Sequence, residues 1–220
     1  MKYFQPKWHF FTEPMPYEST VVKMQHCVDS IISQNDSSQV WVLQHPHLYT
    51  AGISAKQSDL LNSNIDIPIY QTNRGGKYTY HGPGIKIIYV LFDLKQFFAP
   101  SPPDISAFVN FLENWLIATL KHYSIESAKR SDRVGLWITN QQPEKKIAAI
   151  GIKLKKWVSY HGIAINIDPD LSYFNNIVPC GLSADLYGIT SLKKIAPNID
   201  FTDFDRVLQN EFYNILQSPK

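Results

Sequence analysis

Cysteine is scarce in this 220-residue sequence, and long apolar runs are missing. Its two cysteines are Cys27 and Cys180, and 44% of the residues are hydrophobic, enough to form a core without disulfides. No apolar run approaches the roughly 18 residues of a membrane span, and the N-terminal segment lacks the features of a signal or transit peptide. We therefore expect free thiols and a soluble, cytoplasmic protein with no membrane span.

A strong excess of one charge is also missing. Lysine and arginine total 21 residues, aspartate and glutamate 19, and the net charge is only +2. Binding to nucleic acid or to an anionic membrane normally shows as a strongly basic balance or a clustered basic face. The composition therefore predicts no nucleic-acid partner.

Helical and strand-like patterns are interspersed along the chain. Apolar residues at helical spacing predict three helices, with Ile105 and Ile215 on the apolar faces of the second and third. Alternating or continuous β-branched runs predict strands, of which 85–94 is expected to be buried on both faces. This mixture predicts a single α/β (α+β) domain over residues 1–220 with a mixed β-sheet flanked by helices. The predicted helices are 17–32, 104–120 and 202–216, and the predicted strands are 39–44, 85–94, 133–138, 146–153 and 159–167.

Glycine is sparse too, yet four of the ten glycines fall within RGGKYTYHGPG at residues 74–84. A dinucleotide fingerprint does not fit, because Ile87 takes the place of its third glycine and a strand follows. The P-loop pattern is missing from the sequence. Two interpretations remain: the bare backbone lets a ligand approach closely, or it makes two tight turns with no ligand.

Cys180 lies between Pro179 and Gly181 in NNIVPCGL, where we expect a turn to present its thiol. A nucleophilic cysteine must be a thiolate, so it needs a base or a cation beside it. His81, His161 and the lysines that precede IAAIG are candidates, and spacing alone does not choose among them.

Two further histidines, His45 and His47, alternate as metal ligands on a strand could. No cysteine or carboxylate follows at ligand spacing, so we expect no metal.

Four segments together resemble a known family. RGGKYTYHGPG, KKIAAIGIK, SYHGIAINI and IVPCGL are similar, in this order, to the signature segments of lipoyl (octanoyl) transferases. These enzymes move an octanoyl group from acyl carrier protein to a lysine of lipoate-dependent enzymes. Weaker likeness extends to MPYES, HPHLYTAG, RVGLWI and GITSL. The resemblance implies a fold shared with the catalytic domains of lipoate and biotin ligases.

The resemblance also implies roles for particular residues. Cys180 matches the cysteine that accepts the acyl group, and Lys146 matches the lysine that activates it. Lys77-Tyr78 and Ile85 depart from the Gln-Val and Gln that are common in the family. The implied acyl-substrate pocket consists of Arg74, Gly75, Gly76, Lys77, Tyr78, Thr79, Tyr80, His81, Ala149, Ile150, Gly151, Gly162, Ile163 and Ala164.

The implied reaction has a defined donor and acceptor. The donor is octanoyl-acyl carrier protein, and the acceptors are lipoyl domains of 2-oxoacid dehydrogenase E2 subunits and the glycine cleavage H protein. A thioester is already activated, so the transfer requires no ATP and no cofactor. Lys153, Lys155 and Lys156 are candidates for a basic rim facing the acidic carrier protein. Tyr80 and His81 are candidates for shaping the pocket mouth or steering the incoming lysine.

Three alternatives remain open. An ATP-dependent lipoate or biotin ligase shares the fold but does not need the cysteine. A non-catalytic acyl- or protein-binding module does not need both Lys146 and Cys180. A Cys/Lys amidohydrolase transfers the acyl group to water.

Overall fold

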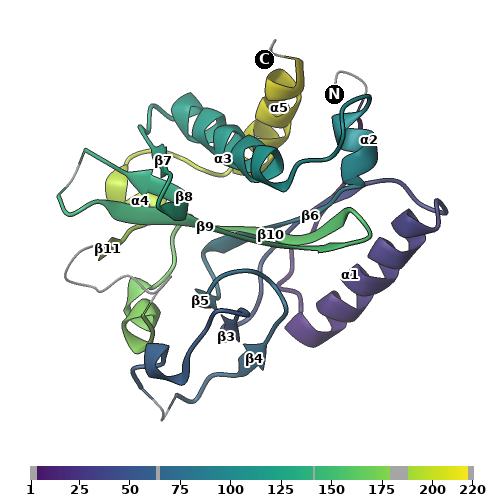
Figure 1. Cartoon of the computed structure of the whole chain (residues 1–220). Coiled ribbons are helices and arrows are strands. Elements are labelled where there is room, and N and C mark those ends of the chain that lie inside the picture. Colours follow the sequence, from purple (N-terminus) through teal and green to yellow (C-terminus); the bar gives the residue numbers. More distant parts are fainter. Residues whose placement is uncertain (1–3, 63–64, 141, 179–187, 218–220) are drawn as a thin grey trace.

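A large mixed β-sheet separates two layers in the computed structural model, which describes residues 4–62, 65–140, 142–178 and 188–217 (Figure 1). The strand order across these described residues is β1-β2-β6-β10-β9-β8-β7, and β11 pairs with β9. β1 is parallel to β2 and β11 is parallel to β9, whereas the other neighbours are antiparallel. The strands are β1 (Lys7–Phe10), β2 (Gln39–Leu43), β6 (Ile85–Leu91), β7 (Ala128–Arg130), β8 (Arg133–Ile138), β9 (Lys145–Lys155), β10 (Val158–Asn166) and β11 (Gly188–Ile189).

Two long helices, α3 (Ile105–His122) and α5 (Phe204–Gln217), cover the upper face of this sheet in Figure 1. The Asp104 side chain begins α3 by accepting a hydrogen bond from the Ala107 amide at 3.0 Å. Trp115 on α3 donates its indole N–H to the Leu208 carbonyl on α5 at 2.7 Å, which fixes the two helices side by side. Two further helices, α2 (Leu94–Phe98) and α4 (Leu192–Ile195), are short.

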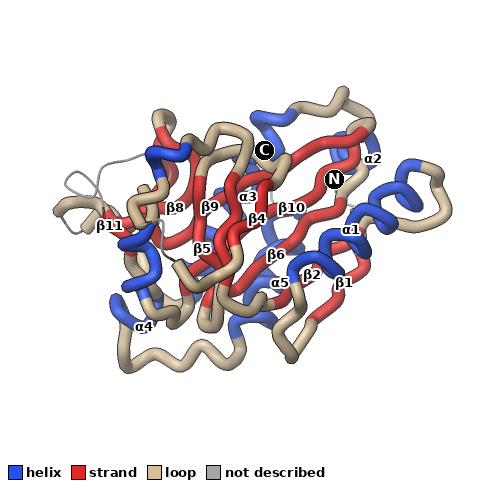
Figure 2. The backbone as a smooth tube through the Cα atoms, turned by 90° about the horizontal axis from the view of Figure 1, so that it is seen from below, coloured by secondary structure: helices blue, strands red, loops and turns tan. Residues whose placement is uncertain are grey.

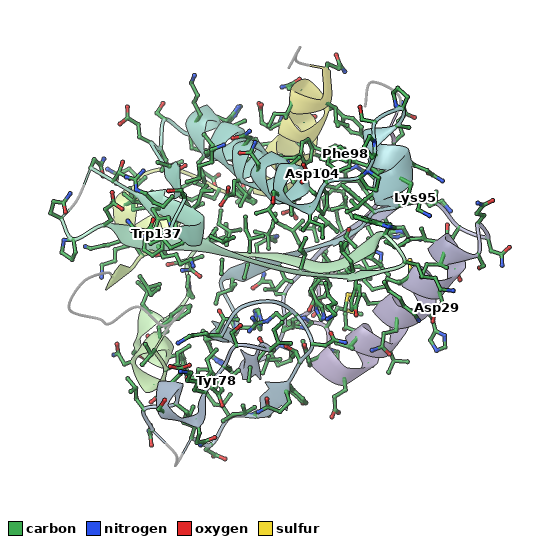
Figure 3. The ribbon with its side chains drawn as sticks, viewed as in Figure 1. Asp29, Tyr78, Lys95, Phe98, Asp104 and Trp137 are labelled. Atoms are coloured by element: carbon green, nitrogen blue, oxygen red, sulfur yellow. The ribbon has the colours of Figure 1, made fainter. Side chains whose placement is uncertain are left out.

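The lower layer contains α1 (Tyr17–Ile32) and a small sheet in the order β4-β3-β5. Its strands are β3 (Leu48–Ala51), β4 (Ile69–Gln71) and β5 (Tyr78–His81), and the 3-10 turns η1 (Gln57–Asp59) and η2 (Leu171–Asn176) lie in the connections. Figure 2 shows this small sheet from below, in front of β9 and β10. Tyr78 lies in this lower layer and Phe98 in the upper one (Figure 3).

The predicted mixed α/β fold is confirmed, and the bounds of α1 and β8 match the predicted 17–32 and 133–138. The predicted strand 85–94 is too long, because the Asp93 side chain accepts from the Lys95 amide at 2.9 Å and starts α2 instead. Ile105, predicted to lie on an apolar face, is 46% exposed. Leu216, and not Ile215, is the buried residue in the last turn of α5.

Cys27 is a free thiol that packs at the edge of the lower core, and burial raises its pKa to about 12. None of the helices formed by the described residues is long and apolar enough to cross a membrane.

Candidate active site

A trough of small residues runs along the lower face of β9 and β10. Ala149 pairs with Ala164 and Gly151 pairs with Gly162, so no large side chain rises from this part of the sheet. At Gly162 a Cβ atom would lie only 2.1 Å from the carbonyl oxygen of Ile88, so the neighbouring strand itself requires glycine there. The sheet therefore provides a flat, apolar floor.

The glycine-rich segment forms the roof over this floor. The Gly75 amide donates to the Ile152 carbonyl at 3.2 Å, which ties the roof to β9. Gly76 has a φ of +87°, a conformation that favours glycine. A Cβ atom at Gly151 would lie 3.0 Å from the Gly75 carbonyl oxygen, so the two segments meet through bare backbone. Close approach of backbone is thus what the glycines permit.

A cavity of about 550 Å³, including its open mouth, lies between floor and roof. All of the predicted substrate-binding residues line it except Tyr80. Tyr80 instead lines a neighbouring cavity of about 320 Å³, which shares Thr79, Ala149 and Ala164 with the first. The middle of the glycine-rich segment, predicted as a loop, is strand β5 (Tyr78–His81) and carries Thr79 into both cavities.

Arg74 holds the roof in place. Its Nη2 donates to the Thr50 carbonyl at 2.8 Å, to the Lys77 carbonyl at 2.8 Å and to Thr50 Oγ1 at 2.7 Å, while Nη1 donates to the Gly75 carbonyl at 2.9 Å. These bonds use backbone carbonyls and a hydroxyl. The guanidinium thus connects β3 to the roof of the larger cavity.

Sequence reasoning missed three lining residues of the larger cavity: Tyr17, Ile87 and Tyr89. His161, considered above only as a partner for Cys180, also lines this cavity. Tyr17 begins α1, and its only signal was the weak likeness of MPYES. Ile87 and Tyr89 are alternate residues of β6 that line the cavity. Because they lie within a continuous apolar run, the sequence pattern does not distinguish them from their neighbours. His161 has a φ of +60°, and its Nε2 lies 3.4 Å from Asn73 Oδ1. Burial lowers the pKa of His161 to about 4, so its ring is neutral at pH 7.

His45, considered above as a metal ligand, has protein partners on both ring nitrogens. Nδ1 donates to the Met15 carbonyl at 2.5 Å, and Nε2 accepts from the Tyr89 hydroxyl at 2.8 Å. Burial lowers the pKa of His45 to about 4. His47 lies elsewhere, with Nδ1 2.6 Å from the Tyr80 hydroxyl. The two histidines therefore stabilise separate parts of the lower layer.

Lys146 lines the smaller cavity and is only 5% exposed. Its backbone lies between Trp137 of β8 and Ile189 of β11, so both edges of β9 are paired at this point. Nζ donates to the Val134 carbonyl at 2.9 Å and lies 5.2 Å from the centroid of the Trp137 ring. Gly135 has a φ of +120°, and a Cβ atom there would lie 2.7 Å from Lys146 Cε. A buried amine is thus fixed next to the apolar trough.

Cys180 lies outside the described residues. The described chain before it ends at Val178, whose amide donates to the Asp59 carbonyl at 2.7 Å. The Asp59 carboxylate pairs with Lys77 of the roof at 3.3 Å. The described chain resumes at Gly188, which pairs with Lys145. The residues on both sides of 179–187 are thus anchored beside the two cavities.

The described residues thus form a mixed α/β domain with an apolar trough next to a buried lysine. Solved structures share this fold. Ta0514, a putative lipoate protein ligase from T. acidophilum, matches with a TM-score of 0.69 at 12% identity over 96% of this chain and 85% of that chain. Lipoate-protein ligase A bound with ATP matches with a TM-score of 0.68 at 13% identity, over 96% of this chain and 85% of that chain.

Sequence similarity gives the family. Residues 16–213 match the model of the lipoyl protein ligase A/B catalytic domain. The octanoyltransferase of Ehrlichia chaffeensis is 45% identical over 99% of both chains, and that of Rhodopseudomonas palustris is 46% identical over 95% of this chain and 84% of its own length. The chain belongs to the lipoyl protein ligase A/B family, and the resemblance predicted from the four motifs is confirmed.

Proposed function

We propose that this protein transfers an octanoyl group from octanoyl-acyl carrier protein to a lysine of a lipoyl domain, through a thioester on Cys180. The observation that carries the proposal is the apolar trough next to buried Lys146, in a chain whose relatives at 45–46% identity are named octanoyltransferase. The acceptors are lipoyl domains of 2-oxoacid dehydrogenase E2 subunits and the glycine cleavage H protein.

The trough supports binding of a medium-length acyl chain. Ala149, Gly151, Gly162 and Ala164 leave the floor open, and Ile87 adds an apolar wall. Burying about six methylene groups contributes roughly 5 kcal/mol. An acetyl group offers almost none of this surface, so the cavity favours octanoyl over short acyl groups.

In the first half-reaction the Cys180 thiol transfers its proton to the Lys146 amine. The thiolate adds to the carbonyl carbon of the donor thioester, and the tetrahedral intermediate expels the pantetheine thiolate. Lys146 then returns the proton to that leaving group. The burial of Lys146 keeps this proton away from bulk water.

In the second half-reaction the amine of the acceptor lysine attacks the acyl-cysteine. Lys146 takes the proton that this amine loses, an amide bond forms, and the Cys180 thiolate is released and reprotonated. The donor is already a thioester, so no ATP enters the balance. This distinguishes the reaction from that of a ligase with the same fold.

The predicted basic rim for the carrier protein is only partly available. Lys155 forms an ion pair with Asp29 at 2.5 Å, at an exposed site where such pairs contribute little stability. Reversing the charges of Lys153 and Lys156 is therefore the better probe of carrier docking. The expected result is a weaker salt dependence of transfer.

The decisive experiment uses intact-protein mass spectrometry after mixing with octanoyl-acyl carrier protein, without ATP. We expect the protein to gain one thiol-labile octanoyl group. Cys180→Ser should lose the adduct, whereas the matched control Cys27→Ser should keep it. Transfer that requires ATP and survives Cys180→Ser would establish a ligase instead, and acyl binding without any transfer would establish a non-catalytic module.

A further inference from the structure

His81, the last residue of β5, lines the larger cavity and carries a buried ring nitrogen without a partner among the described residues. The side chain is buried, with 7% of the residue exposed. Its Nε2 lies 3.2 Å from Thr50 Oγ1. Its Nδ1 is buried and has no hydrogen-bond partner among the described residues. Of the buried side-chain atoms without a hydrogen-bond partner among the described residues, it is the one whose residue lines either of the two cavities described above.

The neighbouring bonds decide where the ring proton lies. A threonine hydroxyl has two acceptor lone pairs and one proton. Thr50 Oγ1 accepts from Arg74 Nε at 3.2 Å and from Arg74 Nη2 at 2.7 Å, which fills both lone pairs. The Thr50 proton is therefore donated to His81 Nε2. The proton of the neutral ring is consequently on Nδ1, which is a donor without an acceptor.

The ring stays neutral in this environment. Burial holds the pKa of His81 well below its usual range, and the neighbouring charges of His45, Arg74 and His161 lower it further. The other polar groups beside it already have partners: the Tyr89 hydroxyl donates to His45, and the Arg74 guanidinium donates to Thr50 and to backbone carbonyls. The ligand or a water molecule must supply the acceptor for His81.

Lys146 and His81 line different cavities, joined at Thr79, Ala149 and Ala164. In the proposed reaction the thioester carbonyl lies by Lys146, so the far end of the acyl chain enters the cavity that contains His81. A methyl-terminated chain long enough to reach Nδ1 offers no acceptor there and leaves the N–H unsatisfied. A chain with an oxygen at that point satisfies it.

We infer that His81 determines acyl specificity: its Nδ1–H makes the inner part of the pocket polar, limits the length of hydrocarbon chains, and favours medium-chain acyl groups with a hydrogen-bond acceptor near the far end. This inference rests on the proposed transfer reaction. The nonanoyl and 8-hydroxyoctanoyl groups test it, because they have the same number of heavy atoms and differ only in the terminal atom.

In competition as acyl-carrier-protein thioesters, the 8-hydroxyoctanoyl group should be transferred about tenfold more efficiently than nonanoyl, because a site built to pair with an oxygen rejects the analogue that lacks it. Equal rates, or a preference for nonanoyl, would overturn the inference.

Two variants separate the unpaired nitrogen from the one that contacts Thr50. The amide group of Gln reaches the position of Nε2, so His81→Gln can keep an acceptor for Thr50 but loses the donor at Nδ1. The amide of Asn lies at the position of Nδ1, so His81→Asn keeps the donor and loses the Thr50 contact. We expect His81→Gln to lose the preference and His81→Asn to retain it. The opposite pattern, or an unchanged preference in both, would contradict the inference.

Calorimetric binding of the free nonanoic and 8-hydroxyoctanoic acids to the unmodified protein keeps the test independent of catalysis. Tighter binding of the hydroxy acid is expected. If octanoyl transfer fails but this preference is present, the proposed function is wrong and the inference about the pocket stands. If octanoyl transfer is active but the two acids bind equally, the inference is wrong and the proposed function stands.

Discussion

The two faces of the large sheet differ in how they are filled. Along β6, Ile88 and Val90 join the core beneath α3 and α5, where Phe92, Phe108, Trp115 and Phe212 are fully buried. Ile87 and Tyr89 on the same strand point to the other face, toward small residues and buried histidines. Large aromatic rings pack the first face, whereas alanine and glycine leave a cavity on the second. One strand thus contributes to stability with one side and to the site with the other.

The strongest test of this division is Lys146→Met. We assign Lys146 the proton transfers of both half-reactions. Its loss should therefore lower kcat by about 10³-fold, which lies within the range for removal of a general acid–base group. Thermal unfolding should change far less. Single-turnover octanoyl transfer measures the effect.

The matched control is Lys145→Met, the neighbouring lysine on β9, which should retain nearly full activity. A Lys146→Met enzyme with normal turnover would remove the catalytic role and leave Lys146 as a structural residue bonded to Val134.

The upper face should respond in the opposite way. Phe212→Ala removes a fully buried ring that contacts Trp8, Phe92, Phe111 and Trp115, so it should cost about 3–5 kcal/mol of unfolding free energy. Below the unfolding transition, kcat should stay within about twofold, because the ring lies across the sheet from the cavity. Urea unfolding and steady-state kinetics check both statements. A large loss of kcat in fully folded enzyme would show that the two faces are coupled.

Acid should weaken the lower layer first. His45 and His161 have pKa values of about 4 in the folded protein against 6.5 ordinarily, so the unfolded chain binds protons first as the pH falls. Stability should be complete above about pH 6.5 and decline toward pH 4, by about 2–4 kcal/mol at pH 5 for the pair. His161→Asn, which suits the positive φ, should reduce the difference in unfolding free energy between pH 7.5 and pH 5 by about 1–2 kcal/mol, with His45 and His81 accounting for further parts of it. An unchanged difference would contradict this assignment.

The smallest expected effect concerns the floor of the trough. Ala149 lines both cavities, and Val in its place adds two methyl groups to the path of the acyl chain. The kcat/KM for octanoyl transfer should fall about tenfold, while butyryl transfer, the internal control, should hardly change. Equal losses for both chains would mean that Ala149 does not border the acyl path.

Local patterns were enough to predict much of the fold. The apolar spacing of Val21, Met24, Val28 and Ile31 predicted α1, and the residues of β8 were predicted in full. The small sheet was not predicted, because its strands are three or four residues long and β5 is hidden within a glycine-rich segment. Such strands depend on pairing between distant segments.

The candidate site, like the fold, could be predicted only in part from the sequence. Motif likeness selected the residues that surround the trough. Thr50 lies within the weaker match HPHLYTAG but was assigned no role, although it lies on β3 and bonds to both Arg74 and His81. The motif likeness also did not reveal the hydrogen bond between His45 and Tyr89 beneath the cavity. These contacts join segments that are far apart in the sequence, and a single threonine or tyrosine carries no periodic signal. Cys180 lies outside the described residues, so its place in the site stays a prediction.

The position of Lys146 has a consequence for its chemical reactivity. Its amine is almost wholly shielded from the surface by Trp137 and the paired edges of β9, yet it borders the cavity that continues into the acyl trough. A polar amine-modifying reagent dissolved in water should therefore label the surface lysines early and Lys146 last. A reactive ester on a medium-length hydrocarbon chain should reverse that order, because it reaches the lysine by the route of the substrate.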